Sequence, residues 1–299
     1  MSNLLLYSIP LFLLCLWLER AWALRRAGTR IRGYETRDTL ASLAMGIGNV
    51  VISAFSTLGA VALWHLAYRH RLLDIGLSTG LGAWALLFVL EDLCYYWFHR
   101  SHHELRVLWA AHVNHHSSQY FNLSTALRQT WFTPFTGPVF WLPLAFIGFA
   151  PERILTAQGV SLLYQFFIHT EVVGKLPRPL EWVFNTPSHH RVHHGKNVPY
   201  LDRNHGGVLI IWDRLFGTFA AEQERVRYGL THDLESFNPL RIAVHEWQAL
   251  GRDLASAGSL GTALRYLFAA PGWSPDGSSL TAAQLRREHD QAQRLPETP

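Results

Sequence analysis

The chain has 299 residues, of which 49% are hydrophobic and only 16% are charged. Soluble domains average about 25% charged residues, so the composition favours a membrane protein over a freely soluble one. The formal net charge of +4 is not concentrated in one basic run, which argues against a nucleic-acid-binding surface. Cys15 and Cys94 both lie in apolar segments, where they are more typical of small hydrophobic residues than of a disulfide or a metal-binding pair.

Five apolar segments precede a polar C-terminal part. They cover residues 4–24, 41–66, 77–98, 131–150 and 154–168. About 20 apolar residues are needed to cross the ~30 Å hydrocarbon core of a bilayer. The second segment contains no charged residue and is the strongest span, whereas the last segment is short. We therefore expect an integral, multi-pass membrane protein in which residues 131–168 form either two spans or a re-entrant hairpin.

Arginines cluster between the first and second segments. They are Arg20, Arg25, Arg26, Arg30, Arg32 and Arg37. The positive-inside rule places this loop in the cytoplasm, and counting spans from it puts residues 99–130 and the chain after residue 169 on the same side. The first segment lacks the basic N-terminal region of a signal peptide, so we expect it to remain as an anchor, in a bacterial inner membrane.

The C-terminal part shows two different patterns. Residues 240–270 carry apolar side chains at helical spacing, which predicts amphipathic helices lying either at the membrane surface or against the cytoplasmic part of the protein. The polar tail 274–299 is expected to be poorly ordered. The predicted domains are an anchor with a basic loop (1–38), a membrane and catalytic domain (39–235), and C-terminal helices with the tail (236–299).

Seventeen histidines are the unusual feature of the composition, and most of them are clustered. The clusters are His99-Arg-Ser-His102-His103, His112-Val-Asn-His115-His116 and His189-His190-Arg-Val-His193-His194. In a helix, residues three or four apart share a face and the adjacent residue is rotated by about 100°. Composition alone predicts the pattern His-x-x-His-His about 0.06 times in such a chain. The pattern occurs twice, so the clusters indicate metal binding.

So many imidazoles beside membrane segments are not explained by apolar packing, because polar groups there must be paired or functional. Eight or nine neutral nitrogen ligands exceed the four that one zinc ion takes, and they suit two metal ions with open positions. Imidazole binds zinc, copper, iron and nickel, so the ligand type does not choose among them. The isolated histidines are expected to be ordinary core or surface residues; they are His65, His70, His232, His245 and His289.

The three clusters resemble the histidine boxes of the fatty acid hydroxylase and sterol desaturase superfamily of membrane di-iron enzymes. Within that superfamily, roughly residues 35–275 are similar to the alkylglycerol monooxygenases. The stretches that carry this similarity are EDLCYYWFHR at 91–100, NLSTALRQ at 122–129, NTPSHHRVHHG at 185–195, DRN at 202–204, GVLIIWDRLFGTF at 207–219 and YGLTH at 228–232.

The resemblance implies a set of nine metal ligands. They are His99, His103, His112, His115, His116, His169, His190, His193 and His194. It further implies two iron ions, O2, a lipid substrate in the membrane, and an external electron donor that is either tetrahydrobiopterin or a donor protein. His102 and His189 are adjacent alternatives to His103 and His190. His205 is expected to lie beside the ligands at most.

Glu91, Tyr95 and His99 follow one another at intervals of four residues, on one helical face that leads to the metals. A charged residue within a span is costly, so Glu91 is expected to orient a ligand or to contact the substrate or the electron donor. The alternative is a carboxylate near the helix end that reaches the membrane surface. Glu91, Tyr95 and Asn122 are the predicted catalytic residues. Asp92 points elsewhere and is expected to pair with an arginine, either Arg100 or Arg128.

The sequence therefore predicts an all-α, polytopic membrane helical bundle with a cytoplasmic helical cap that carries a two-metal site. The expected activity is O2-dependent hydroxylation of a lipid C–H bond, with cleavage of alkyl ether lipids as the form that the resemblance implies. A desaturase or a sterol or carotenoid hydroxylase of the same superfamily is the first alternative, and a non-enzymatic metal-transport protein is the second. A zinc protease is disfavoured, because His103-Glu104 is followed by Leu-Arg-Val and the His-Glu-x-x-His signature is absent.

Overall fold

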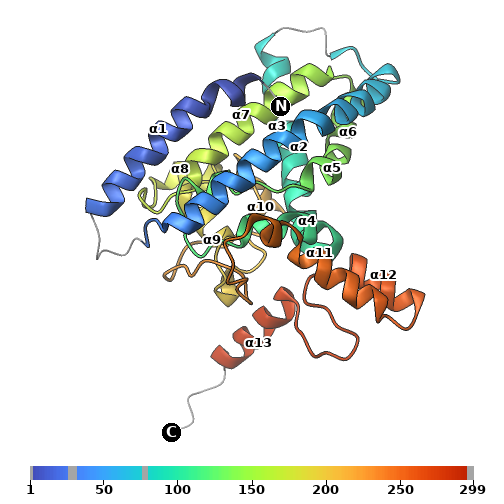
Figure 1. The fold of residues 1–299 in the computed structure, drawn as a ribbon. Helices are drawn as coiled ribbons and strands as arrows, with labels where there is room; N and C mark the ends of the chain where they lie inside the picture. Colours follow the sequence, from blue (N-terminus) through green and yellow to red (C-terminus); the bar gives the residue numbers. More distant parts are fainter. Residues whose placement is uncertain (1–2, 26–31, 76–79, 295–299) are drawn as a thin grey trace.

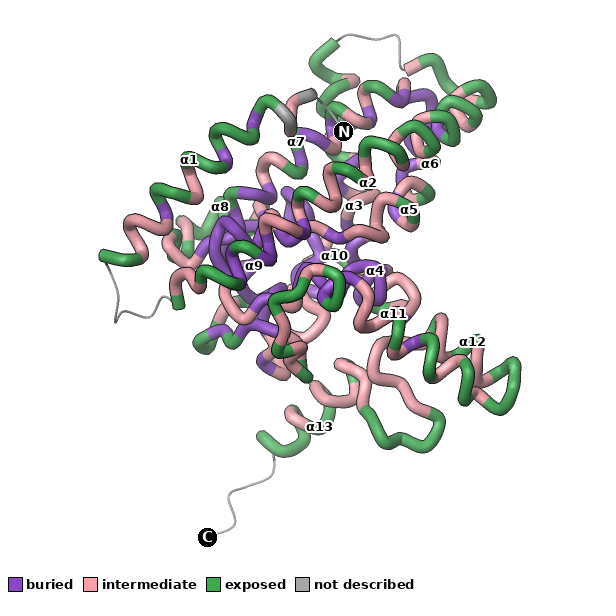
Figure 2. Tube along the Cα trace, in the orientation of Figure 1, coloured by how far each residue is buried: buried purple, intermediate pink, exposed green. Residues whose placement is uncertain are grey.

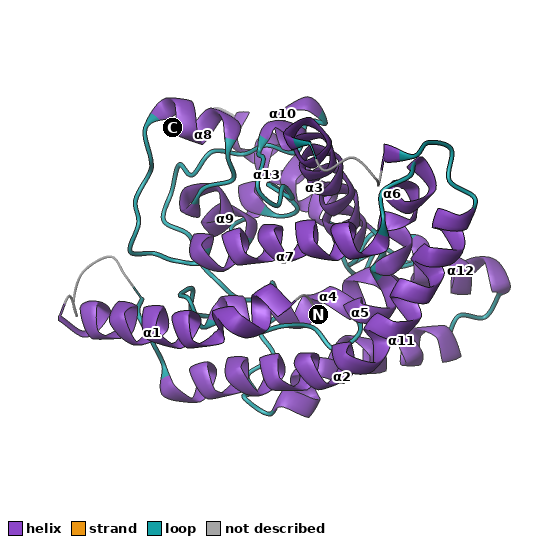
Figure 3. Ribbon diagram, turned by 90° about the horizontal axis from the view of Figure 1, so that it is seen from above, coloured by secondary structure: helices purple, strands orange, loops and turns teal. Residues whose placement is uncertain are grey.

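The computed structural model describes residues 3–25, 32–75 and 80–294. These residues form helices and loops without a β-strand, apart from two isolated bridges, Phe184 with Leu209 and Gly195 with Tyr228 (Figure 3). The predicted all-α class is therefore confirmed. Arg26 and Arg30 of the predicted basic loop, Leu77 at the start of the third apolar segment, and the last five residues of the tail lie outside the described residues.

Three helices in the described part of the chain are long and apolar enough to cross a membrane. They are α1 (Asn3–Arg25), α2 (Thr36–Arg69) and α3 (Leu81–Glu104), which run at the upper side of Figure 1. On α2, Phe55 is 74% exposed and Leu58 is 73% exposed. Figure 2 shows exposed residues along much of α1 and α2. Extended apolar surfaces of this kind are typical of contact with lipid and are rare in soluble proteins.

The fourth and fifth apolar segments differ from each other. Residues 131–150 are divided into α5 (Thr133–Thr136), the 3₁₀ helix η3 (Pro138–Trp141) and α6 (Leu142–Ile147), so this segment is not one continuous helix. Proline occurs in the first turn of each piece, where it fits, but it cannot continue a preceding helix. Residues of the fifth segment form one helix, α7 (Pro151–Ile168), which packs against α1, α2 and α3.

A buried carboxylate fixes the lower end of α1 to the rest of the protein. Glu19 is only 8% exposed, and it accepts hydrogen bonds from the Tyr34 hydroxyl, the Thr170 hydroxyl and the Leu123 amide. These donors come from three different loops, so Glu19 joins α1 to the segments that lead into and out of the histidine region. No sequence pattern indicates this role, because the donors Leu123 and Thr170 are more than 100 residues away from Glu19 in the chain.

Short helices cover the ends of the long ones. They are α4 (Arg106–His116), the 3₁₀ helix η2 (Thr125–Leu127), α8 (Arg178–Val183), α9 (Pro187–His193), the 3₁₀ helix η4 (Val198–Tyr200) and α10 (Ile211–Leu215). Two of them, α4 and α9, carry most of the second and third histidine clusters. Figure 2 shows that buried residues concentrate in this region, around α4 and α9. Most of the buried polar residues therefore lie at the end of the bundle where the histidine clusters are, while apolar residues such as Trp64, Leu87 and Ile154 pack between the long helices.

The predicted pairing of Asp92 with an arginine is wrong. The Asp92 carboxylate accepts hydrogen bonds from the backbone amides of Val208 and Leu209, at 2.7 and 3.0 Å, and from the Trp212 indole. Two backbone donors and an indole satisfy a buried carboxylate without a cation. Asp92 thereby ties the 206–212 segment to α3. Arg100 instead pairs with Glu104 at 2.8 Å, one turn further along the same helix.

The C-terminal part contains α11 (Pro239–Ala255), α12 (Leu260–Phe268) and α13 (Ala282–Arg294). The predicted amphipathic region 240–270 is helical, and α11 packs on α4 and α2. The expectation of a poorly ordered tail is wrong for residues 282–294. The Gln284 side chain accepts from the Thr281 amide at 2.8 Å, and the Thr281 hydroxyl accepts from the Gln284 amide. This reciprocal capping box stabilises the start of α13, and its Thr-x-x-Gln spacing is visible in the sequence.

Arg128 forms a buried ion pair with Asp38 that joins the loop after α4 to the start of α2. The guanidinium is 1% exposed and also bonds to Ser42 and Ser117. Replacing Arg128 by methionine would leave the Asp38 charge buried without its partner, which costs about 3–5 kcal/mol. We expect a clear drop in the thermal unfolding midpoint in detergent, while Arg37→Gln, at an exposed position one residue before Asp38, leaves it unchanged. Equal midpoints for the two variants would show that the pair does not stabilise the fold.

Candidate metal centre

Four segments bring nine buried histidines together. The end of α3 supplies His99 and His103. A single residue, Leu105, separates α3 from α4. Helix α4 packs back against α3, so the second cluster faces the first. The third cluster lies on α9 and at its end, and His169 follows directly after α7. The nine positions are those that the resemblance implies: His99, His103, His112, His115, His116, His169, His190, His193 and His194.

The nine histidines form two groups, each compact enough to hold a metal ion. The first group contains five residues, His99, His103, His112, His116 and His193, and the second contains four, His115, His169, His190 and His194. Within each group the candidate ligand atoms all lie within 4.8 Å of one another. The groups adjoin, because adjacent residues such as His115 and His116 belong to different groups, as do His193 and His194. The arrangement can therefore hold two ions side by side.

Backbone carbonyls fix the orientation of four imidazole rings. The Nδ1 atoms of His99 and His193 lie 2.9 Å from the carbonyls of His205 and Arg203, respectively. In the second group, Nδ1 of His115 lies 3.2 Å from the Arg128 carbonyl, and Nδ1 of His169 lies 2.6 Å from the Gln165 carbonyl. A carbonyl oxygen only accepts, so each Nδ1 carries the hydrogen and each Nε2 presents a lone pair. This is the arrangement found in histidines that bind metals.

The lone pairs of His115 and His169 then face each other. Their Nε2 atoms are 3.3 Å apart, and neither atom has a hydrogen to donate. Two lone pairs at this distance repel, and the contact is favourable only when a cation lies between them. The Nε2 atoms of His103, His193 and His194 have no hydrogen-bond partner among the described residues, although all three are buried. Buried polar atoms are normally paired. Both observations fit a site made for metal ions.

Burial keeps these imidazoles neutral. It lowers the pKa of His115 to about 4 and the pKa of His193 to about 3. For His112 and His116 on α4, and for His190 and His194, burial again lowers the pKa, and the neighbouring imidazoles lower it further. Metals bind the deprotonated ring. The protein therefore presents its ligands ready for binding at neutral pH.

Comparison with known proteins indicates the family of this chain. Residues 84–218, which include all nine histidines, match the family model described as Fatty acid hydroxylase. The chain carries a fatty acid hydroxylase domain. It is 38% identical over 259 residues to an alkylglycerol monooxygenase of Xenopus tropicalis, covering 85% of this chain and 56% of the relative. The human alkylglycerol monooxygenase is 40% identical over 240 residues, covering 80% and 53%.

A bacterial relative matches less of the chain. An ornithine lipid hydroxylase of Rhizobium tropici is 32% identical over 132 residues, which cover 44% of this chain and 40% of the relative. The chain spans about half the length of the alkylglycerol monooxygenases that it matches. No solved structure matches it. The family that the histidine boxes predicted is thus confirmed, while the activity and substrate of the longer relatives are not thereby assigned to this chain.

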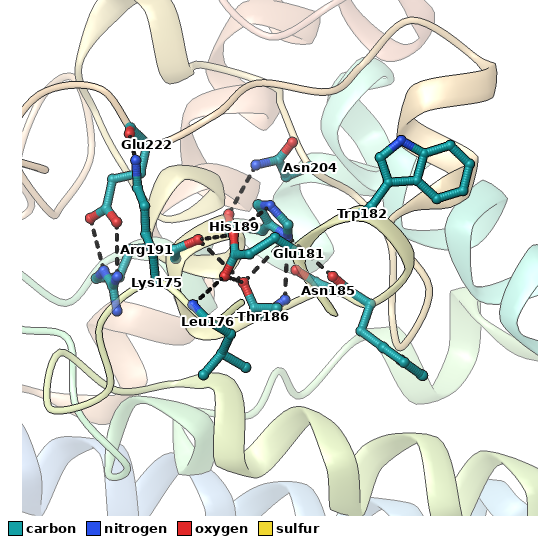
Figure 4. A network of polar contacts seen from close by, with 12 residues as sticks. Lys175, Leu176, Glu181, Trp182, Asn185, Thr186, His189, Arg191, Asn204 and Glu222 are labelled. Carbon is teal, nitrogen blue, oxygen red and sulfur yellow. Dashed lines mark hydrogen bonds and ion pairs between the residues drawn. The ribbon is translucent and has the colours of Figure 1, made fainter. Parts of the chain in front are cut away.

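The two alternative histidines, His102 and His189, make structural contacts instead of joining the two groups. Nδ1 of His102 bonds to the Phe98 carbonyl at 2.7 Å and Nε2 bonds to Thr136 at 2.8 Å. His189 lies 3.1 Å from the Glu181 carboxylate and takes part in a capping box with Thr186 at the start of α9. Figure 4 shows His189 turned toward Glu181 and Thr186. Both rings have partners on both nitrogens, and neither belongs to the two groups.

His205 and the isolated histidines also lie outside the two groups. The His205 ring is buried, its centroid is 5.0 Å from that of His103, and neither of its nitrogens has a partner among the described residues. Its backbone carbonyl supports His99. His65 lies 3.4 Å from the Glu152 carboxylate, and His245 bonds to the Ile242 carbonyl. His70, His232 and His289 are not members of either group.

The three predicted catalytic residues lie in two different environments. Glu91 is fully buried; one carboxylate oxygen accepts from the Trp141 indole at 3.3 Å, and the other has no partner among the described residues. The Tyr95 ring packs edge-on against His99, with centroids 5.3 Å apart. Asn122 instead holds a turn, because its side chain bonds to the Gly33 carbonyl and to Ser124. A catalytic role for each of them stays a prediction.

An apolar cavity of about 800 Å³ lies beside both histidine groups. His112 of the first group and His115 and His169 of the second line it, together with Glu91 and Tyr95. Its walls come largely from α1, α2, α3 and α7, and include Leu5, Ile9, Phe12, Ile47, Val50, Ala60, Trp64, Trp141, Leu162 and Phe166. Neither lysine nor arginine is among the described residues that line it. The volume falls within the range of small-molecule sites, about 300–1,000 Å³.

Asp202 supports the five-histidine group from outside. Its carboxylate lies 3.3 Å from Nδ1 of His103, and Asp202 adopts a left-handed backbone conformation with φ of 49°, which Asn and Asp tolerate best. We expect Asp202→Asn to keep the backbone but to weaken metal binding about 10–100-fold, because the carboxylate no longer strengthens His103 as a ligand. Competition with a chelator measures this affinity. Asp276→Asn, on an exposed loop, is the control, and equal affinities would contradict the role of Asp202.

Proposed function

We propose that this chain is a membrane two-metal oxygenase that hydroxylates a C–H bond of a lipid, using O2 and two external electrons. The observation that carries the proposal is the position of the apolar cavity, whose lining includes histidines from both groups. A lipid chain in this cavity would meet the metal centre directly. The relatives named as lipid-modifying oxygenases support the same class of reaction.

We propose iron for both sites. The ligand atoms of the two groups are imidazole nitrogens, without a thiolate or carboxylate among the described members. This donor set accepts iron, zinc or copper, and the choice of iron rests on the resemblance to the di-iron superfamily. When bound, two iron ions would supply the activation of O2 and the removal of a hydrogen atom from the substrate carbon.

The protein's own contribution is to hold ligands, to position the substrate and to exclude water. The carbonyls of His205, Arg203, Arg128 and Gln165 fix four ligand rings, so little rearrangement is needed during the reaction. Apolar side chains along the cavity keep water from the reacting carbon. The free oxygen of Glu91 lines the same cavity and can accept a hydrogen bond from a hydroxyl group of the lipid.

The walls of the cavity support a membrane setting. Residues of α1 and α2, two of the helices able to span a membrane, line it, so a lipid can enter from the bilayer without crossing water. We place the metal centre on the cytoplasmic face of a bacterial inner membrane, following the arginines near the start of α2. Tetrahydrobiopterin is the electron donor that the resemblance implies, and a donor protein is the alternative.

A 1-O-alkylglycerol is the substrate to test first, since the relatives are named alkylglycerol monooxygenase. Hydroxylation of the carbon next to the ether oxygen gives a hemiacetal, which breaks down to a fatty aldehyde and glycerol. With iron-loaded protein, a reductant and ¹⁸O2, followed by immediate borohydride reduction, we expect a fatty alcohol that carries one ¹⁸O atom. Mass spectrometry of the extracted lipids measures it.

The same assay separates the alternatives. An alkene without ¹⁸O would show a desaturase, and an ¹⁸O-labelled hydroxyl on an ornithine lipid, a sterol or a carotenoid would change the substrate but keep the hydroxylase. If the iron-loaded protein consumes no O2 in the presence of any of these lipid classes, the oxygenase proposal is wrong. Metal transport would then be the hypothesis to test, by measuring metal uptake into vesicles that contain the protein.

A further inference from the structure

A second cavity lies next to the five-histidine group, since Asp202 lines it and contacts His103. It has a volume of about 370 Å³ and shares no lining residue with the apolar cavity. The end of α3, the loop around residue 202, residues 216–218 and the start of α13 surround it. Its lining includes five charged residues, Arg100, Arg203, Arg286, Glu104 and Asp202, whereas Glu91 is the only Asp, Glu, Lys or Arg among the described lining residues of the lipid cavity. A ligand of this cavity would therefore be small and polar.

Two of its arginines make no direct ion pair with a described residue, although the Asp202 carboxylate of the same cavity attracts both electrostatically. Arg100 pairs with Glu104 at 2.8 Å, which neutralises it. Arg203 bonds to the Gly217 carbonyl at 2.9 Å and Arg286 bonds to the Leu201 carbonyl, but neither guanidinium has a carboxylate of a described residue within 4.0 Å. The pKa of Arg286 is lowered first by burial and next by the positive charge of Arg203, so the two cations are close. The cavity thus holds three guanidiniums against the two carboxylates of Glu104 and Asp202, and this excess of cationic donors favours an acceptor-rich or anionic ligand.

One pair of side chains connects this cavity to the metal centre. Asp202 lines the cavity, and its carboxylate lies 3.3 Å from Nδ1 of His103. Nε2 of the same ring belongs to the five-histidine group. A molecule beside Asp202 is thus separated from the metal site by a single imidazole. The lipid can occupy its own cavity at the same time, because the two cavities are separate.

We propose that the cavity formed by Arg203, Arg286 and Asp202 binds the external electron donor, a small, acceptor-rich two-electron reductant such as an enediolate or a reduced pterin. The role rests on the proposed function, in which RH, O2, two electrons and two protons give ROH and H2O. The donor supplies both electrons and is itself oxidised by two electrons. Its size must match a cavity of about 370 Å³, and its oxygen or nitrogen acceptors meet the two guanidiniums.

Binding to the metal-free, full-length protein in nanodiscs tests the site without any activity. Ascorbate and tetrahydrobiopterin are the two probes, titrated anaerobically by calorimetry. We expect the variant Arg203→Gln/Arg286→Gln to raise the Kd of at least one probe about tenfold or more, because two charge-assisted hydrogen bonds are lost. Arg287→Gln, at an exposed position of the same helix, is the matched control and should change neither Kd. Which probe responds identifies the donor chemistry.

A second variant keeps the test meaningful if the double variant does not fold. Ala283 lines the cavity from the first turn of α13 and is exposed, so Ala283→Trp fills the cavity without disturbing a core. It should weaken the same probe as the double variant. Unchanged Kd values for both probes in both variants, or binding that does not saturate in the unmodified protein, would overturn the proposal.

Hydrogen peroxide separates this inference from the proposed function. RH and H2O2 give ROH and H2O, so peroxide replaces both O2 and the donor. In iron-loaded protein we expect the variants to lose donor-driven turnover but to keep peroxide-driven turnover. If the donor binds as predicted but no lipid product forms with either oxidant, the proposed function fails and the binding site stands. If the variants bind the donor normally while lipid is hydroxylated, the site fails and the function stands.

Discussion

His190→Ala is expected to reduce the bound metal from about two ions per chain to about one and to abolish lipid oxidation. His190 belongs to the four-histidine group, and its Nε2 atom lies 2.9 Å from Nε2 of His169. Its loss leaves three ligands for that ion. Residues that only support a ligand already change affinity or activity about 10–100-fold, so the loss of a ligand should exceed this range. Metal analysis of anaerobically purified protein and the ¹⁸O assay measure the two effects.

The adjacent residue provides the control. His189→Gln changes a histidine next to His190, but glutamine is a favoured residue at this position of a capping box with Thr186. The start of α9 is therefore preserved, as are the contacts of Thr186 that Figure 4 shows. We expect two ions per chain and activity within a few-fold of the unmodified protein. If His189→Gln loses a metal ion and His190→Ala does not, the assignment of ligands on α9 is reversed.

The second large effect is acid sensitivity of the metal-free protein. His115 and His193 have pKa values of about 4 and about 3 in the folded state, both lowered by burial. In the unfolded chain they titrate near 6.5. Below that pH the unfolded state binds protons that the folded state does not, so stability falls as the pH decreases from 6.5 toward 4. From pH 8 to pH 5, each of the two residues contributes a loss of about 2 kcal/mol.

Thermal unfolding of the metal-free protein in detergent, followed between pH 8 and pH 5, measures this loss. His115→Leu removes one of the two groups and should reduce the loss over this range by about 2 kcal/mol. Bound metal should oppose the effect near neutral pH, because protons and metal compete for the same nitrogens. An unfolding midpoint that stays constant from pH 7 to pH 5 in the metal-free protein would contradict the burial of neutral imidazoles.

The sequence was sufficient to predict which histidines come together, because most of them follow helical spacing. His99 and His103 are four residues apart, and His112 and His116 repeat that interval on the next helix. Both segments are helical in the structure, so this spacing places each pair of histidines on one helix face. The resemblance, in turn, favours His103 over His102 and His190 over His189. Spacing alone does not make that choice. The partners of His102 and His189, which are Thr136 and Glu181, are distant in sequence or lie on another helix.

The supporting contacts could not be predicted, because they depend on the tertiary fold. Asp92 bonds to backbone amides more than 100 residues away, and no sequence pattern marks an amide as the partner of a carboxylate. The carbonyls that orient the ligand rings have no sequence signature either. Arg128 provides an example of both kinds of contact, because its side chain pairs with Asp38 and its backbone carbonyl accepts a hydrogen bond from His115. In contrast, the Thr-x-x-Gln spacing at the start of α13 is visible in the sequence, while the polar composition of the same segment favours disorder.

The most direct test is Mössbauer spectroscopy of protein purified anaerobically after growth on ⁵⁷Fe, together with the iron count. A centre held by five imidazoles on one side and four on the other predicts two iron ions per chain in two inequivalent nitrogen-rich sites, with signals of equal area. About one iron per chain, giving a signal that is unchanged when a histidine of either group is replaced, would contradict the account.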